Sequence, residues 1–119
     1  MNTQEIAKDV ASLCEQGKFA ESGDKYWADD VVSVEAGGQG DPVSRGKAAA
    51  RAKGDGFMGA HEIHDVRVEG PWVNGEQFSV RFTMDMTNKQ SGQRMTMDEI
   101  GVYTLKDGKI AEERFFYAG

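Results

Sequence analysis

Cysteine, histidine and positive charge are scarce in this sequence. Its 119 residues include one cysteine, Cys14, so no disulfide can form within the chain. No group of cysteines and histidines has the spacing of zinc ligands, and a chain of this length buries enough surface to fold without a metal. We therefore expect one domain over residues 1–119 that resides in the reducing cytoplasm and binds no metal.

The sequence also lacks net positive charge and long apolar runs. Lys and Arg number 14 against 20 Asp and Glu, which gives a net charge of -6 that repels nucleic acids and anionic lipids. Charged residues interrupt the first turns of the chain where a signal peptide would be apolar, and no segment approaches the roughly 18 apolar residues of a membrane span. The sequence predicts neither a nucleic-acid partner nor a membrane partner.

The first half of the chain has helical periodicity. Apolar residues recur at i, i+4, i+7 and i+8 within residues 3–16, at Ile6, Val10, Leu13 and Cys14. Asn2 or Thr3 can cap this predicted helix, and Gly17 can end it. A shorter apolar rhythm from residue 18 predicts a second helix that closes at residues 29–30.

A strand, a loop and a third helix are expected next. Residues 31–35 are typical of a strand, and the glycine-rich residues 36–42 are typical of a flexible loop. The loop glycines lack the spacing of a phosphate-binding loop, so no nucleotide site is expected. Four alanines favour a helix over residues 44–53, and we expect the glycines at 54, 56 and 59 to end it.

The second half of the chain is strand-like. Strands are predicted over residues 61–69, 76–88, 94–105 and 109–117, with short turns between them. Apolar and polar side chains alternate over residues 78–87, so one face of that strand is buried. Helices followed by antiparallel strands, with connections too short for parallel crossovers, predict an α+β domain with helices against one face of a curved sheet.

This order of elements, together with two segments, resembles a known superfamily. The segments are Tyr26-Trp-Ala-Asp-Asp-Val-Val-Ser-Val-Glu35 and Asp107-Gly-Lys-Ile-Ala-Glu-Glu113. They resemble the nuclear transport factor 2-like superfamily, above all its SnoaL-like polyketide cyclases and ketosteroid isomerases. The resemblance implies a cone-shaped, cystatin-like α+β barrel in which three helices and a strongly bent, antiparallel or mixed sheet enclose one pocket, commonly in a homodimer. It leaves function open, because this fold serves enzymes, ligand binders and interaction modules.

The resemblance also assigns residues. It places Glu35 where ketosteroid isomerases keep the carboxylate that moves the proton. The positions of their two oxyanion donors hold Val10 and Gly101 in this sequence. Since loss of one such donor costs about 100- to 1,000-fold in rate, we do not expect classical ketosteroid isomerase activity.

The hairpin at Asp107-Gly108 leaves the facing of the last strand open. With a bulged turn, the residues of the last strand that share a face with Glu99 and Tyr103 are Glu113, Phe115 and Tyr117. With a tight two-residue turn, the residues on that face are instead Glu112, Arg114 and Phe116. The resemblance favours the bulged form, with Glu113 in the pocket. It also points His64, Val66 and Val68 inward.

The resulting hypothesis is a mostly apolar cavity with four convergent polar groups, Glu35, His64, Glu99 and Glu113. Its predicted walls are Trp27, Val66, Phe78, Val80, Phe82, Met84, Tyr103, Phe115 and Tyr117. Carboxylates crowded into an apolar site have raised pKa values and can exchange protons near neutral pH. Such a site could isomerise, cyclise or dehydrate a small apolar carbonyl compound without a cofactor.

Other interpretations compete with this one. Each carboxylate can instead be solvated or salt-bridged, and the cavity can bind an apolar molecule without turning it over. A third alternative is an interaction module whose outer sheet face, with Ile100, Val102 and Phe115 or Phe116, pairs with another chain; we expect a homodimer through that face. The basic residues of the third helix, Arg45, Lys47, Arg51 and Lys53, favour a solvated face over an anion site.

Overall fold

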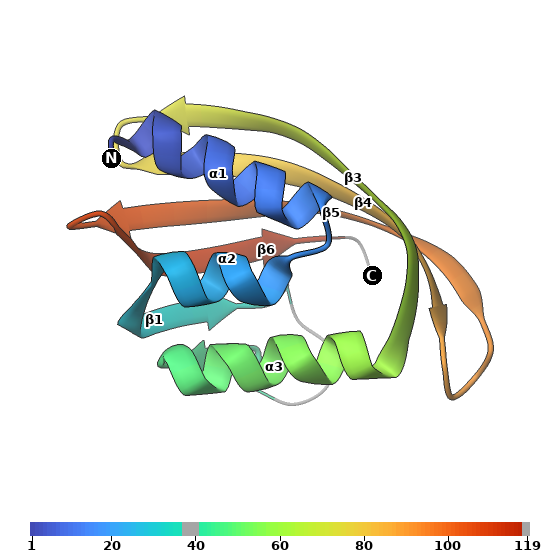
Figure 1. The fold of residues 1–119 in the computed structure, drawn as a ribbon. Coiled ribbons are helices and arrows are strands. Elements are labelled where there is room, and N and C mark those ends of the chain that lie inside the picture. The colour runs from blue at the N-terminus through green and yellow to red at the C-terminus, as the bar shows by residue number, and fades with distance from the viewer. Residues whose placement is uncertain (37–40, 118–119) are drawn as a thin grey trace.

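The helices of the protein lie on the concave side of one curved sheet (Figure 1). The computed structural model describes residues 1–36 and 41–117, and this part contains three helices and six strands. The helices and strands are α1 (Thr3–Glu15), α2 (Phe19–Tyr26), β1 (Trp27–Val34), β2 (Val43–Arg45), α3 (Lys47–Ala60), β3 (His61–Asn74), β4 (Gln77–Asn88), β5 (Arg94–Lys106) and β6 (Lys109–Phe116). Residues 37–40 of the loop expected over 36–42 lie outside the described residues.

The sheet is mixed and open. Its strand order is β2-β1-β6-β5-β4-β3, with β1 parallel to β6 and every other neighbouring pair antiparallel. The long strands β3, β4 and β5 bend over α1 and carry the sheet from α1 toward α3 (Figure 1). The α+β architecture expected from the sequence is confirmed, although β2 and β3 remain edges and do not close a barrel.

Helix α1 forms as its sequence predicts. The Asn2 side chain accepts a 2.8 Å hydrogen bond from the backbone N–H of Glu5, and the Glu5 carboxylate accepts one from Asn2 in return. This capping box satisfies free N–H groups of the first turn. Lys25 and Tyr26 of α2 both donate to Asp9 of α1, so the two helices are joined by polar contacts as well as by packing.

Four element boundaries differ from the prediction. Residues 43–45 form strand β2, which pairs with β1, so the third helix begins at Lys47 and not at residue 44. Strand β1 begins at Trp27, which pairs with Ile110 of β6, so the second helix ends at Tyr26 and not at residues 29–30. Helix α3 continues through Gly54, Gly56 and Gly59 to Ala60, since packing against the sheet outweighs a cost of roughly 1 kcal/mol per glycine. Strand β3 continues through residues 70–74, which were expected to turn, and the chain reverses at residues 75–76.

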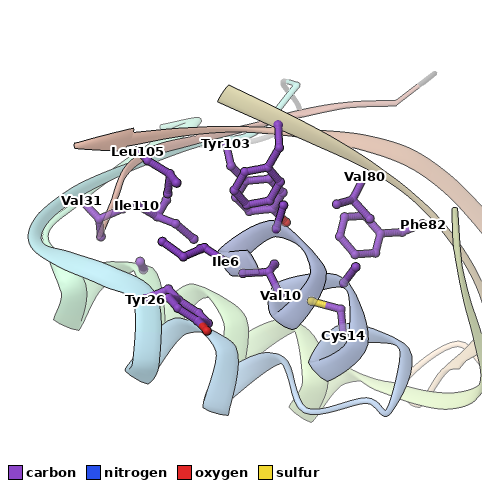
Figure 2. Close-up of a cluster of buried hydrophobic side chains, with 14 residues drawn as sticks. Ile6, Val10, Cys14, Tyr26, Val31, Val80, Phe82, Tyr103, Leu105 and Ile110 are labelled. Atoms are coloured by element: carbon purple, nitrogen blue, oxygen red, sulfur yellow. The ribbon is translucent and has the colours of Figure 1, made fainter. Parts of the chain in front are cut away.

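The core fills one end of the concave face. Ile6, Val10 and Cys14 of α1 lie against the buried side chains of β4, β5 and β6 (Figure 2). Phe78 of β4 stacks on Tyr103 of β5 with ring centroids 4.8 Å apart. Alternate residues of β4 from Phe78 to Met86 are buried, as the alternation in the sequence predicts. Within the described residues, no helix has the length and apolar character to cross a membrane.

Candidate functional site

A pocket of about 390 Å³ lies beside this core. Helices α2 and α3 form one side of it, and the concave faces of β1, β4, β5 and β6 form the other. Its walls are largely apolar and include Phe19, Trp27, Ala50, Phe57, Met58, Phe82, Met84, Met97, Tyr103, Ile110, Phe115 and Tyr117. Three glutamate carboxyl groups, those of Glu35, Glu99 and Glu113, reach the same space from three different segments. A fourth carboxyl group, that of the exposed Asp55 of α3, also lines the pocket and pairs with Arg51 at 3.2 Å.

The register of the last hairpin brings Glu113 to the pocket. Asp107 and Gly108 both have positive φ, of 53° and 77°, which is the geometry of a tight two-residue turn. The register then shifts within β6: Leu105 pairs with Ile110, whereas Thr104 pairs with Glu112, so Ala111 is an extra residue. Because of this bulge, Glu113 lies opposite Tyr103 and points inward. The turn is therefore tight, and the bulge lies inside the strand.

Glu113 is the most enclosed of the three carboxyl groups, with 5% of its surface exposed. The indole Nε1 of Trp27 donates to its Oε1 at 2.7 Å, and the hydroxyl of Ser33 donates to its Oε2 at 2.7 Å. Burial raises the pKa of Glu113, while both hydrogen bonds oppose that rise. The two donors hold the carboxyl group in one orientation.

Glu35 is paired with a lysine from α3. Lys53 Nζ lies 2.7 Å from Glu35 Oε1, and it donates a 2.5 Å hydrogen bond to Ser33 Oγ. The Tyr117 hydroxyl lies 3.3 Å from the other oxygen of Glu35 and donates to it. Since Ser33 also donates to Glu113, a continuous chain of polar contacts joins Tyr117, Glu35, Lys53, Ser33 and Glu113.

Glu99 differs from both of these carboxylates. Among the described residues, none donates a hydrogen bond to its carboxyl group or forms an ion pair with it. Burial raises the pKa of Glu99 to about 7, and the negative charges of Glu35 and Glu113 add to the rise, while Lys53 opposes it. Near neutral pH, Glu99 therefore exists in both its protonated and its ionised form.

Other polar groups of the pocket stay protonated. Burial raises the pKa of the Cys14 thiol to about 12, which excludes a thiolate nucleophile at neutral pH. Burial likewise raises the pKa of Tyr103 well above its usual value. Within the described residues, no group of His, Cys, Asp and Glu side chains is arranged to hold a metal ion.

Six of the nine side chains expected in the walls line the pocket: Trp27, Phe82, Met84, Tyr103, Phe115 and Tyr117. The other three lie elsewhere. Phe78 and Val80 are buried in the core against α1, and Val66 is half-buried outside the pocket. The alternation of β4 places Phe78 and Val80 on the correct face, but helix α1 covers that end of the sheet.

His64 does not face the pocket, contrary to expectation. A shift of register between Ile63 and Asp65 makes His64 an extra residue in β3, and its Nε2 lies 2.7 Å from the hydroxyl of Thr87. The Thr87 side chain is on the outer face of the sheet, because the alternate residues Met84 and Met86 are buried on the inner face. A bulge moves a side chain to the opposite face, so His64 is solvent-exposed.

The sequence did not predict two polar residues of the site, Ser33 and Lys53. Lys53 was expected on a solvated face near the end of a shorter helix. In the longer α3, Ala50, Lys53, Gly54 and Phe57 recur at i, i+3, i+4 and i+7, the spacing of one helix face, and all four line the pocket. That spacing is visible in the sequence once the glycines are allowed inside the helix.

The fold and the pocket define an open α+β domain of the cystatin-like, nuclear transport factor 2-like class. The family model of the SnoaL-like domain matches residues 1–117, so the chain belongs to the SnoaL-like family. A SnoaL-like protein of Mesorhizobium loti, provisionally described as a polyketide cyclase with carbohydrate phosphatase as a second description, is 51% identical. The alignment covers 98% of this chain and 100% of that one, with a TM-score of 0.94.

More distant structures show the fold alone. A protein of unknown function with a cystatin-like fold from Xanthomonas campestris is 22% identical, with a TM-score of 0.81 over 100% of this chain and 92% of that one. A protein with a ketosteroid isomerase-like fold from Catenulispora acidiphila, in complex with trimethylamine, is 14% identical, with a TM-score of 0.75 over 98% and 88%. A comparison with curated proteins finds no significant match.

Proposed function

We propose that the protein catalyses proton transfer at a carbon next to a carbonyl group, in a small apolar compound and without a cofactor. Reactions of this type isomerise, cyclise or dehydrate such compounds. The observation that carries the proposal is Glu99, a carboxyl group that reaches an apolar pocket without a hydrogen-bond partner among the described residues. Its two neighbours, Glu35 and Glu113, are held by other side chains.

The properties of Glu99 suit a group that takes up a proton and returns it. General acid–base catalysis is most effective when the pKa of the catalytic group lies near the working pH, and it contributes about 100- to 10,000-fold in rate. The pKa of Glu99, about 7, meets this condition. The largely apolar walls disfavour water, which would otherwise compete for the same proton.

The dimensions of the pocket favour a compact substrate. A volume of about 390 Å³ lies near the lower end of the roughly 300–1,000 Å³ that is usual for small-molecule sites. Aromatic rings from α2, α3 and β6, those of Phe19, Phe57 and Phe115, supply flat apolar surfaces. We therefore expect a compact ring ketone to be a better substrate than a long acyl chain.

Hydrogen–deuterium exchange tests the proposal directly. 2-Tetralone, a compact ketone with acidic α-hydrogens, is incubated with the protein in D2O, and loss of the α-proton signals is followed by NMR. We expect the wild type to accelerate exchange above the buffer rate and Glu99→Gln to lose at least about 100-fold of that acceleration. The rate should rise as pH increases through about 7, because the base must be ionised.

Glu112→Gln is the matched control. Glu112 precedes Glu113 on β6, pairs with Arg114 at 2.8 Å and does not line the pocket. Its variant should exchange at the wild-type rate. The proposal is wrong if the wild type does not exceed the buffer rate or if Glu99→Gln exchanges as fast as the wild type. Binding of 2-tetralone without exchange would support a non-catalytic ligand-binding protein instead.

A further inference from the structure

We propose that Lys53 stabilises the negative charge that forms on the substrate oxygen, so that the carbonyl oxygen lies beside Lys53 and the reacting carbon beside Glu99. This inference rests on the proposed proton transfer and deepens it by assigning a second catalytic residue. It also narrows the ligand class to molecules that present an oxygen able to become anionic.

Lys53 is placed at the pocket as a donor. Its Nζ donates to Ser33 Oγ at 2.5 Å and pairs with Glu35 Oε1 at 2.7 Å. An ammonium group has three N–H donors, so among the described residues these two partners leave one donor for a ligand. The same nitrogen lies 5.4 Å from the centre of the Phe115 ring, which lines the pocket.

The surrounding polar contacts hold the ammonium group in position. Glu35 balances its charge directly, and the Ser33 hydroxyl accepts from Lys53 while donating to the buried Glu113. A donor that is oriented before the reaction stabilises a developing charge at little cost of reorganisation. Lys53 thus offers the oxyanion contact that Val10 and Gly101 do not supply.

The charges of Lys53 and Glu99 act on each other. Both side chains line the same pocket. At this position the positive charge of Lys53 lowers the pKa of Glu99, against the larger effect of burial. When the α C–H bond breaks, its proton goes to the Glu99 carboxylate and its electron pair forms the carbon–carbon double bond of an enolate. The carbonyl π electrons move to the oxygen, which accepts a hydrogen bond from the free N–H of Lys53. Return of the proton from Glu99 to a carbon of the enolate closes the cycle.

2-Naphthol and naphthalene distinguish charge stabilisation from simple apolar binding. Ionised 2-naphthol carries its charge on oxygen, as an enolate does, and it absorbs at longer wavelength than the neutral form. At pH 8 Glu99 is mostly ionised and can take up the proton that 2-naphthol releases, as it takes up the α-proton of a ketone. We therefore expect the wild type to bind 2-naphthol largely in its ionised form. Lys53→Met should lose the absorption of the ionised form and bind 2-naphthol at least about tenfold more weakly, while naphthalene binds within about twofold of wild type.

Two further variants test whether charge decides the form of 2-naphthol that binds. Lys53→Gln keeps an amide that can donate hydrogen bonds but carries no charge, so it should lose the ionised form even where Lys53→Met does not fold. Glu99→Gln removes a nearby negative charge and should retain or strengthen the ionised form. The inference is overturned if the wild type binds only neutral 2-naphthol, if it does not bind 2-naphthol, or if Lys53→Gln keeps the ionised form.

These measurements separate the two proposals. Loss of exchange in Glu99→Gln together with a persistent ionised band in Lys53→Gln would refute the role of Lys53 and leave proton transfer in place. Loss of the ionised band in Lys53→Gln without any exchange by the wild type would refute proton transfer and leave an anion site at Lys53.

Discussion

Glu99 and Glu113 show how two identical side chains in one pocket acquire different properties. Burial raises the pKa of both. Glu113 accepts hydrogen bonds from Trp27 and Ser33, which favour its ionised form and fix its orientation. Glu99 has no such donors among the described residues. Glu113 is therefore suited to position its neighbours, and Glu99 is suited to exchange protons.

The raised pKa of Glu99 predicts a pH-dependent stability. Between its usual value of 4.5 and about 7, the folded protein binds a proton that the unfolded chain has released. The contribution of Glu99 to the free energy of unfolding must therefore fall as pH rises through this window, by up to about 3 kcal/mol. Glu99→Gln should lose this fall and be more stable than wild type at pH 8, as measured by urea unfolding at pH 4 and pH 8.

The difference in the free energy of unfolding between Glu99→Gln and wild type separates the contribution of Glu99 from those of the other titrating groups. Glu112→Gln is again the control, because its carboxylate is at the surface and pairs with Arg114. Its stability difference from wild type should change little between the two pH values. If the difference in stability between Glu99→Gln and wild type is also the same at pH 4 and pH 8, the raised pKa of Glu99 is contradicted.

At the scale of elements, the glycines of α2 and α3 have opposite roles. A Cβ added at Gly56 of α3 would meet no atom within 4 Å, whereas one added at Gly23 of α2 would lie 2.5 Å from Cζ3 of Trp27. Gly23 thus permits the close approach of the indole that donates to Glu113. Gly56 only weakens its helix.

Alanine substitutions should separate these roles. Gly56→Ala should raise the free energy of unfolding by about 0.5–1 kcal/mol, because alanine favours the helix and the site is open. Gly23→Ala should lower it by about 1–3 kcal/mol, since the indole must move. Chemical unfolding of both variants measures whether each substitution raises or lowers the free energy of unfolding. A Gly23→Ala variant more stable than wild type would show that the Trp27 indole does not need the space beside Gly23.

One extra residue in β6 decides which face its side chains occupy. Ala111 shifts the register, so Glu113 and Phe115 point into the pocket while Phe116 is exposed on the outer face. A strand alternates its side chains with a period of two, so a shift of one residue exchanges the faces. The composition of the pocket therefore depends on a single bulge.

At the scale of the whole molecule, apolar side chains remain exposed on the outer face of the sheet. Ile100 and Phe116 are paired across β5 and β6 and are 44% and 51% exposed. Val102 lies on the same face of β5, opposite Ser79, which in turn pairs with the exposed Trp72. We propose that this outer face contacts a second copy of the chain in a two-fold homodimer, where one apolar patch can cover its equivalent.

Charge introduced into that patch should break such a dimer. We expect the wild type to sediment as a dimer at micromolar concentration and Phe116→Glu to sediment as a monomer, because a buried, unpaired carboxylate is costly. Gln90→Glu adds the same charge at the exposed turn between β4 and β5 and should remain dimeric. Analytical ultracentrifugation measures the oligomeric state of the wild type and both variants, and a monomeric wild type would refute this interface.

Local patterns in the sequence were sufficient to predict most of the elements. The apolar spacing of α1, the alternation of β4 and the turn residues Asp107-Gly108 are properties of neighbouring residues, and each of these confirmed features follows from them. The inward direction of Glu35, Glu99 and Glu113 was also expected, although Glu113 depended on the resemblance to choose between two registers.

Only the tertiary structure decided which polar side chains meet. The sequence by itself determined the α+β class, the order of the helices and long strands, and the acidic character of the site. It did not determine the bulges that expose His64 and turn Glu113 inward, the continuation of α3 that brings Lys53 to Glu35, or the covering of Phe78 and Val80 by α1. Bulge positions, helix ends and contacts between distant segments depend on packing energies summed over the whole chain, which no local pattern records.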